Sequence, residues 1–388
     1  MEITGLIPDG YTDCTGLINR AIQQLPDEGG ELVLPPGDIL IEKPIIIDRS
    51  KVSIRGYGRE ITRLLIGSSG LGFSIGHSQN QISRIRLSDL TINTTNTLSN
   101  GAGISAHLVI DIRITNCLLA NLHCGIELNN ASFAYITDVE IIDPGTASDK
   151  GIGVLIHGNG IHNDQYLTRV FVQSRKQVKP CDAGYRIVNT QGIWMDSCGA
   201  FHCNTGVHLM ADNGKTLEHV FLSNNAIDSC VGHGFLINAG PGARARRIQS
   251  IGDWSSSNQG HGVLVDGAEG EIEDIKLLSS RLYGNGGDGV HISNTKSITI
   301  DNATIAGNGI NGHSSGISIA NPCELIAIRN NIIGAYSGFE NTQSFAISGL
   351  DHVSRGLVTG NIFEPNRNGV FSAVSPRVLI ANNLDPVN

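Results

Sequence analysis

The chain has 388 residues, of which 48 are glycine, 40% are apolar and 16% are charged, and its formal net charge is −9. Glycine at this level exceeds the usual share of about 7%, but the chain has only 12 prolines and no three-residue period, so it is not collagenous, and its apolar fraction is too high for a disordered chain. The absence of long apolar runs argues against a membrane helix, and the acidic balance argues against a nucleic-acid partner.

The N-terminal residues, Met1 to Thr4, show no basic segment followed by an apolar one, so no signal peptide is expected in the chain as given. The localisation stays open between cytoplasmic, virion-associated and secreted after trimming. Eight cysteines form neither a C-x-x-C pair nor a zinc spacing, which predicts reduced, buried thiols and no metal site, with a disulfide between Cys198 and Cys203 as an alternative. No nucleotide fingerprint occurs, so no cofactor is expected.

The first predicted element is an amphipathic helix over residues 15–25, with Asp13 or Thr15 as its N-cap. Leu17, Ile18, Ala21, Ile22 and Leu25 form its apolar side. Short strands are predicted next, around residues 31–34, 45–47 and 52–54. The open end of a stacked-strand protein needs a cover, and the helix is the best candidate for one.

A short phrase then recurs along the chain, made of glycine followed by an apolar, a variable and an apolar residue. Its glycines are mostly 27 or 28 residues apart, as from Gly234 to Gly262 and from Gly262 to Gly289. Between the copies lies a second phrase, in which alternating apolar residues precede an asparagine. The glycines of the first phrase are Gly125, Gly153, Gly184, Gly206, Gly234, Gly262, Gly289 and Gly316, and the asparagines of the second are Asn116, Asn224, Asn302 and Asn330.

These phrases predict very short strands separated by bends, because the apolar residues alternate. Asparagine and glycine at the bends are expected to adopt left-handed backbone conformations. A unit of this length cannot bury its apolar face alone, so successive units must stack. The predicted fold is therefore all-β, a right-handed parallel β-helix (solenoid) with an N-terminal capping helix. We expect one continuous domain, in which residues 1–75 form the cap and first coils and residues 76–388 form the remaining coils.

Several N-terminal segments carry a family resemblance: Asp9 to Asp13 with the helix, Gly29 and Gly30, Leu34 to Gly37, and Val52 to Gly58. They resemble the cap of the pectate-lyase-like β-helix superfamily, an opening that also occurs in phage tailspike depolymerases and fructan-processing fructotransferases. The resemblance implies activity on long carbohydrates, by cleavage, isomerisation or transfer. It also implies a homo-oligomer, since tailspikes and fructotransferases are trimers.

Candidate catalytic residues stand directly before the repeated glycines. Equivalent positions of successive coils stack about 4.8 Å apart, so His233, His261 and Asp288 are expected to form one column. Histidine can act as a general acid or base near neutral pH. Polygalacturonases also use a Gly-His-Gly element, which implies a polysaccharide site on this column. The chain lacks their Asn-Thr-Asp and Asp-Asp elements, which speaks against polygalacturonase activity itself. The alternative is a solvated histidine edge without chemistry.

A second column lies inside the repeated phrase, where the variable residue must face outward. It holds the candidate substrate-binding residues Glu127, Arg186, His208 and His291. Leu236 and Leu264 interrupt this polar strip, which suggests either a floor on which sugars stack or a surface covered by another subunit.

Asp228 and Asp253 are further catalytic candidates, because glycosidic cleavage usually needs two carboxylates. Trp254, beside Asp253, is a candidate sugar platform. For each aspartate alone, a hydrogen bond to the backbone of the bend is the competing explanation.

We therefore expect an enzyme that cleaves glycosidic bonds of a polysaccharide or oligosaccharide, by hydrolysis or intramolecular transfer. The alternatives are a polysaccharide lyase or polyuronate epimerase, and a non-catalytic carbohydrate-binding spike or adhesin module.

Overall fold

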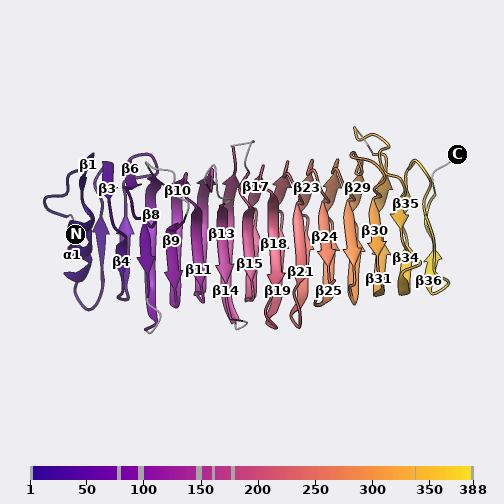
Figure 1. Ribbon diagram of the computed structural model, residues 1–388, viewed down its shortest axis with the longest axis horizontal. Helices are drawn as coiled ribbons and strands as arrows, with labels where there is room; N and C mark the ends of the chain where they lie inside the picture. The colour runs from indigo at the N-terminus through magenta and orange to yellow at the C-terminus, as the bar shows by residue number, and fades with distance from the viewer. Residues whose placement is uncertain are drawn as a thin grey trace. The chain divides into compact units, whose positions relative to one another are not determined.

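The computed structural model describes residues 3–76, 80–94, 100–145, 151–159, 162–175, 180–336 and 338–385. The chain forms two compact units, Met1–Arg186 and Ile187–Asn388. In each unit, short parallel strands from successive turns pair with one another, as in a solenoid (Figure 1). The predicted all-β parallel solenoid is confirmed. The predicted division at residue 75 stays a prediction.

The helix α1 (Thr15–Gln23) lies at the N-terminal end of unit 1, beside β4 (Figure 1). Ile18, Ala21 and Ile22 are buried, as the sequence pattern predicts. The predicted N-cap is wrong: Cys14 occupies that position, and no side chain caps the helix there. The Asp13 carboxylate instead accepts hydrogen bonds from the Thr15 backbone N–H at 2.9 Å and from its hydroxyl at 2.5 Å.

Unit 1 consists of two sheets of parallel strands. The strands β8, β10 and β12 are long because each turns a corner without a loop, with Asp89, Asn116 and Asp138 at positive φ in their middles. The first sheet contains β1 (Asp9–Asp13), β2 (Gly30–Val33), β3 (Gly37–Ile41), β5 (Val52–Arg55), β6 (Thr62–Ile66), β8 (Ile82–Thr94), β10 (Val109–Ala120), β12 (Ser132–Ile142) and β14 (His162–Gln173); the second contains β4 (Ile45–Ile47), β7 (Phe73–Ile75), β9 (Ala102–His107), β11 (Cys124–Asn129), β13 (Ile152–His157) and β15 (Ala183–Val188), which contains the boundary between the units.

Unit 2 has three strands per turn, and equivalent strands of successive turns pair to form three rows. The first row contains β16 (Gln191–Asp196), β19 (Thr216–Ser223), β22 (Arg244–Ile251), β25 (Glu271–Leu278), β28 (Ser297–Asp301), β31 (Cys323–Arg329), β34 (Val353–Thr359) and β36 (Val378–Ala381). The second row contains β17 (Gly199–Phe201), β20 (Ala226–Asp228), β23 (Trp254–Ser256), β26 (Arg281–Tyr283), β29 (Thr304–Ala306), β32 (Ile332–Gly334) and β35 (Ile362–Phe363). The third row contains β18 (Thr205–Ala211), β21 (Phe235–Ala239), β24 (Val263–Asp266), β27 (Val290–Ser293), β30 (Ile317–Ala320) and β33 (Ile347–Ser348).

The asparagines of the second phrase adopt the predicted left-handed conformation, with φ between 52° and 56° at Asn116, Asn224, Asn302 and Asn330. In unit 2 the residue after this bend often points inward and bonds to the next turn. Asn331, for example, donates from Nδ2 to Asn361 Oδ1 at 2.9 Å and accepts the Ala303 backbone N–H at 2.8 Å. Such ladders satisfy buried backbone groups at each corner.

The glycines of the first phrase serve close packing and have no positive φ. A Cβ atom on Gly234 would lie 2.0 Å from Ser255 Oγ and 2.7 Å from the Gly262 carbonyl oxygen. On Gly262 it would lie 2.6 Å from the carbonyl oxygen of Gly289. The spacing of the phrase therefore reflects backbone contacts between successive turns.

The prediction of buried thiols without disulfides is confirmed, because all eight cysteines are buried and none is paired with another. None of the helices among the described residues is long and apolar enough to cross a membrane.

Candidate functional site

His233, His261, Asp288 and His291 come together on the third row of unit 2. His233, His261 and Asp288 stand two residues before strands β21, β24 and β27, respectively, and His291 lies in β27 opposite Leu264 of β24. The rings of His233 and His261 stack with their centroids 5.2 Å apart and an angle of 4° between their planes. His261 and His291 stack at 4.8 Å and 28°. His233 and His261 of the first predicted column therefore form one continuous stack of three imidazoles with His291 of the second column.

Asp288 is the buried acid of this cluster, with 6% of its surface exposed. Its Oδ1 accepts the Ser315 backbone N–H at 2.6 Å, and its Oδ2 accepts the Ser318 hydroxyl at 2.6 Å. His291 Nδ1 lies 3.1 Å from the same Oδ2 and 2.7 Å from Ser318 Oγ. Burial alone would raise the pKa of Asp288, but the hydrogen bonds that its carboxylate accepts, from His291, Ser318 and the Ser315 backbone, hold that pKa well below the usual range. The carboxylate is therefore ionised.

The hydrogen bonds of the cluster assign a tautomer to each histidine. His233 Nδ1 accepts the His261 backbone N–H at 3.1 Å, and His261 Nδ1 accepts the Asp288 backbone N–H at 2.9 Å. His261 Nδ1 also lies 3.3 Å from Asp288 Oδ2. A nitrogen whose lone pair accepts a hydrogen bond carries no proton, so His261 Nδ1 accepts the Asp288 backbone N–H and does not donate to Asp288 Oδ2. Both rings then carry their proton on Nε2.

His291 has the opposite tautomer, because its Nδ1 donates toward Asp288 and Ser318. Its Nε2 is therefore a proton acceptor, in a ring that stacks on the His261 ring with its Nε2–H donor. Burial, followed by the neighbouring His261 and His291, lowers the pKa of His233 to about 4, so that ring is neutral near pH 7. The cluster can thus remove a proton through His291, supported by an ionised carboxylate.

One ligand atom each from His261, Asp288 and His291 lies within 4.8 Å of the others, a spacing that could hold a metal ion. In the structure, both Nδ1 atoms and both Asp288 oxygens make hydrogen bonds, either within the cluster or with Ser315 and Ser318. The arrangement described is a proton-sharing network.

His208 lies elsewhere on the third row. It stands in β18 opposite Leu236 of β21, and its Nε2 lies 2.9 Å from Asn238 Oδ1. Leu236 and Leu264 are half-buried and follow one another in register between His208 and His291. The outward column therefore has the predicted order.

Asp228, Trp254 and Asp253 lie away from the histidine stack. Asp228 ends β20 and Trp254 begins β23 on the second row, where Trp254 is 46% exposed. Asp253 is 1% exposed, so it cannot touch a polymer without rearrangement. It accepts bonds from Asn225 Nδ2 at 2.9 Å and Ser250 Oγ at 2.6 Å, and burial raises its pKa to about 6. It occupies a corner-ladder position.

Glu127 and Arg186 belong to unit 1. Glu127 accepts hydrogen bonds from His157 Nε2 and Ser105 Oγ, each at 3.0 Å. The bond from His157 is the main cause that lowers the pKa of Glu127. Arg186 forms an ion pair with Asp182 at 2.5 Å.

Sequence reasoning missed Ser315 and Ser318, which complete the hydrogen bonds of Asp288. A signal was present, since Ser318 stands opposite His291 in the outward column and Ser315 follows Asp288 in the column before the glycines. Serine is so common at strand edges that the column position alone did not single it out.

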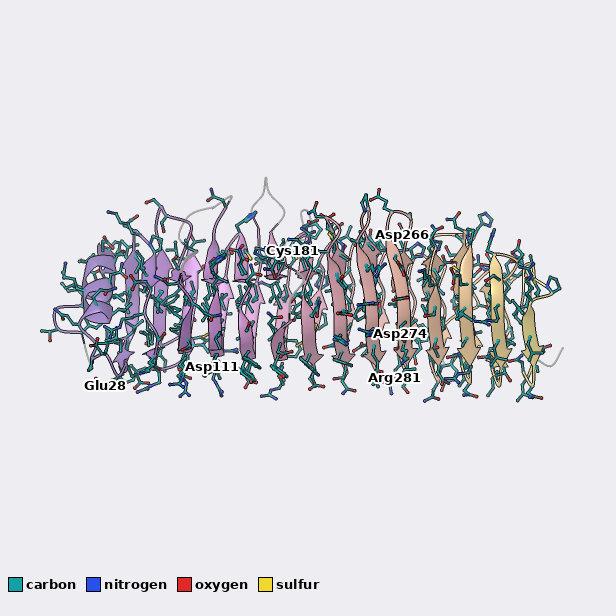
Figure 2. All side chains as sticks on the ribbon, turned by 90° about the horizontal axis from the view of Figure 1, so that it is seen from below. Glu28, Asp111, Cys181, Asp266, Asp274 and Arg281 are labelled. Carbon is teal, nitrogen blue, oxygen red and sulfur yellow. The ribbon has the colours of Figure 1, made fainter. Side chains whose placement is uncertain are left out.

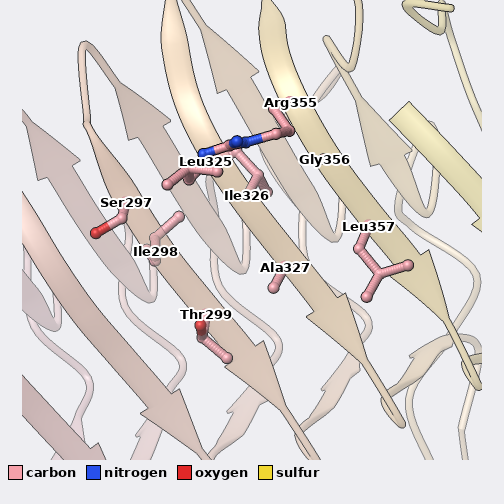
Figure 3. Close-up of a pocket in the computed structure, with 9 residues that line it drawn as sticks. All are labelled: Ser297, Ile298, Thr299, Leu325, Ile326, Ala327, Arg355, Gly356 and Leu357. Carbon is pink, nitrogen blue, oxygen red and sulfur yellow. The ribbon is translucent and has the colours of Figure 1, made fainter. Parts of the chain in front are cut away.

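A pocket of about 330 Å³ lies on the first row of unit 2, over β28, β31 and β34 (Figure 3). It is lined mainly by apolar groups, including Ile298, Leu325 and Leu357. No predicted site residue lines it, so the histidine cluster and this pocket are different features.

Comparison with known proteins agrees with this architecture. A family model described as "Rhamnogalacturonase A/epimerase, pectate lyase-like" matches residues 3–236, and one described as "Right handed beta helix region" matches residues 251–384. These matches define a right-handed β-helix protein of the pectate-lyase-like class. The chain belongs to the rhamnogalacturonase A/epimerase, pectate lyase-like family. No curated protein matches it.

Solved structures with the same fold include the A-module of Azotobacter vinelandii mannuronan C-5 epimerase AlgE6, which is 15% identical with a TM-score of 0.60, covering 99% of this chain and 98% of that one. Tailspike protein 3 of bacteriophage CBA120 is 14% identical with a TM-score of 0.65, covering 98% of this chain and 60% of that one. A mutant tailspike of Escherichia coli bacteriophage HK620 is 10% identical with a TM-score of 0.66, covering 96% and 77%. At these identities the likeness shows the fold alone.

Proposed function

We propose that the protein is a carbohydrate-active enzyme that cleaves glycosidic bonds of a polysaccharide or oligosaccharide, with His291 as its proton-accepting group. The observation that carries the proposal is the bonding of His291 Nδ1 toward the ionised, buried Asp288 and toward Ser318, at 3.1 and 2.7 Å. Membership of a family that includes rhamnogalacturonase A supports a carbohydrate substrate.

The roles follow from the assigned tautomers. His291 Nε2 accepts a proton from the substrate or from water, and the negative charge of Asp288 stabilises the imidazolium that forms. His261 donates from Nε2–H to an oxygen on which negative charge develops. It acts as a hydrogen-bond donor only, because a neutral imidazole that gave up its proton would become an anion.

The composition of the cluster favours elimination over hydrolysis as the cleavage reaction. Hydrolysis of glycosides usually needs two carboxylates, one of them protonated, whereas the described residues of the cluster include one, which is ionised. In an elimination, His291 removes the proton on the carbon next to a uronate carboxylate. The bond to the glycosidic oxygen breaks, a carbon–carbon double bond forms, and the leaving oxygen takes the proton from the imidazolium. Hydrolysis, the first expectation from the sequence, would require an acid from outside the cluster.

The test is a panel of plant, capsular and fructan polymers incubated with the wild-type protein and with His291→Gln. Asp274→Asn, an exposed site on β25 (Figure 2), is the control. Products with the ultraviolet absorbance of an unsaturated uronate indicate elimination, and new reducing ends without that absorbance indicate hydrolysis. Solvent deuterium uptake without chain scission would indicate an epimerase. If no polymer changes, the protein is a carbohydrate-binding or structural solenoid.

We also propose that the protein forms a homo-oligomer. The resemblance of its N-terminal segments to tailspikes and fructotransferases implies a trimer. Two large aliphatic side chains, Leu379 and Leu384, are more than 60% exposed, which supports a surface that another copy covers. Size-exclusion chromatography with light scattering should give a mass of three chains, and a monomer at assay concentration would contradict the proposal.

A further inference from the structure

One outward row of unit 1 combines cations with stacked aromatic rings. The backbone registers place Arg86 of β8, Arg113 of β10, Tyr135 of β12 and Tyr166 of β14 opposite one another on successive strands. With strands about 4.8 Å apart, the row is about 14 Å long. We call these four residues the arginine–tyrosine row.

The two tyrosines form a stacked ladder with Arg113. Their rings stack with centroids 5.0 Å apart and an angle of 6° between the planes, and the Arg113 guanidinium lies 4.8 Å from the Tyr135 centroid. Both tyrosines are half-buried, so the ladder is held in place while part of it faces outward. Because Arg113 and Tyr166 cover the two faces of the Tyr135 ring, the row offers a polymer its ring edges and phenolic hydroxyls, which can exchange hydrogen bonds with sugar hydroxyls.

A second row runs parallel to the first, two residues further along each strand. It presents hydroxyl groups from Ser88, Thr115, Thr137 and Thr168, which are also in register. Hydroxyls in register can exchange hydrogen bonds with the hydroxyls of a chain that lies across the strands.

A cationic pocket of about 250 Å³ adjoins the arginine end of the row. Lys51, Arg84 and Arg86 line it, all three are exposed, and none forms an ion pair within the described residues. The nearby arginines, by contrast, have acidic partners: Arg113 is paired with Asp111 at 3.0 Å, and Arg55 with Glu31 at 3.3 Å. Three positive charges without an acidic partner among the described residues stand out on a chain whose net charge is −9.

We propose that this face of unit 1 binds an anionic polysaccharide. An acid group of the polymer occupies the pocket of Lys51, Arg84 and Arg86, and the adjoining sugars lie along the outward edges and hydroxyls of Tyr135 and Tyr166. Arginine is suited to this task because its planar fork matches a carboxylate or sulfate. The site belongs to unit 1 and the histidine cluster to unit 2, and the inference does not depend on catalysis at that cluster.

The experiment measures binding to oligogalacturonate by isothermal titration calorimetry, in the full chain carrying His291→Gln so that turnover does not interfere. The probes for comparison are a neutral dextran and single-stranded DNA of similar length. We expect oligogalacturonate to bind with an affinity that falls as salt rises, and dextran to bind far more weakly.

The double variant Arg84→Gln/Arg86→Gln should weaken binding at least about tenfold and flatten the salt dependence. Tyr135→Ala/Tyr166→Ala should weaken it about three- to tenfold and leave the salt dependence unchanged. Arg281→Gln, an exposed arginine of unit 2 (Figure 2), should have no effect. Circular dichroism checks that each variant is folded.

Unchanged binding in both folded double variants would overturn the proposal, as would equal loss in Arg281→Gln. DNA binding as tight as oligogalacturonate binding would also overturn it, because the surface would then attract any polyanion. If oligogalacturonate binds as predicted but the wild-type protein modifies no polymer, the proposed function fails and this site stands.

Discussion

Replacement of Asp253 by asparagine should stabilise the protein at neutral pH. The carboxyl group is 1% exposed and burial raises its pKa to about 6, whereas an unfolded chain has a value of about 3.9. Because the folded pKa is higher, the folded state holds a proton that the unfolded state has lost between these two values. Stability from this group therefore falls as the pH rises from about 3.9 to about 6 and is constant above.

The magnitude follows from the shift, since about 2 pH units at 1.36 kcal/mol each give about 3 kcal/mol. Asparagine keeps the shape of the side chain. Its Oδ1 can still accept the bonds from Asn225, at 2.8 and 2.9 Å, and its Nδ2 can donate to Ser250 Oγ in place of the bond that the carboxylate accepts there. Because of that exchange, we expect Asp253→Asn to raise the free energy of unfolding by about 2 kcal/mol at pH 7.

Urea unfolding at several pH values from 3.5 to 8 measures this difference. The gain should vanish near pH 3.5 and reach its plateau near pH 7, while the control Asp228→Asn, a half-buried residue of β20, should change stability by less than about 0.5 kcal/mol. Destabilisation at pH 7, or a gain independent of pH, would refute the account of a buried charge. A folded Asp253→Asn variant without activity would show that the carboxylate is needed for catalysis after all.

Three further predictions concern stability. The pKa of His233 is lowered to about 4, so the stability that this neutral ring contributes is present above pH 6.5 and is lost as the pH falls toward 4. His233→Gln should therefore reduce the loss of stability between pH 7 and pH 4.5 by about 1 kcal/mol, a value that allows for screening by solvent. Urea unfolding at these two pH values measures the difference. Asn331→Ala should lower the free energy of unfolding in urea by about 3 kcal/mol, because it leaves buried backbone groups without hydrogen bonds. Asn368→Ala, at an exposed position, should change it almost not at all. Equal effects of the two substitutions would contradict the asparagine ladder. Gly234→Ala should lower the melting temperature by several degrees or prevent folding, since its Cβ atom would lie 2.0 Å from Ser255 Oγ. Gly16→Ala in α1 should be neutral or stabilising. A Gly234→Ala variant with an unchanged melting temperature would refute the close packing of successive turns at this glycine.

Much of the fold could be predicted, because each turn of a solenoid repeats the same physical demands. The repeated glycine, the apolar alternation and the asparagine at positive φ all follow from one turn stacked on the next. The same stacking predicted that His233, His261 and Asp288 would meet. It could not predict the tautomers, because these depend on backbone N–H groups that face Nδ1 at about 3 Å.

Asp253 shows where sequence reasoning stopped. Residue pairs such as Asn224–Asn225 and Asn330–Asn331 place the first member at positive φ and the second inside the corner. Gly252, at φ 68°, and Asp253 form the same kind of pair. A comparison of these pairs along the sequence would have assigned Asp253 to the ladder, but an aspartate after a strand also fits an exposed acid, and burial decides between the two.

The most direct test of the central claim is the kcat of Asp288→Asn on whichever polymer the wild-type protein modifies. If His291 and Asp288 are the proton-transfer pair, loss of the carboxylate charge should lower kcat about 10²- to 10⁴-fold and leave KM nearly unchanged. A folded Asp288→Asn variant whose kcat stays within about twofold of the wild-type value would contradict the claim.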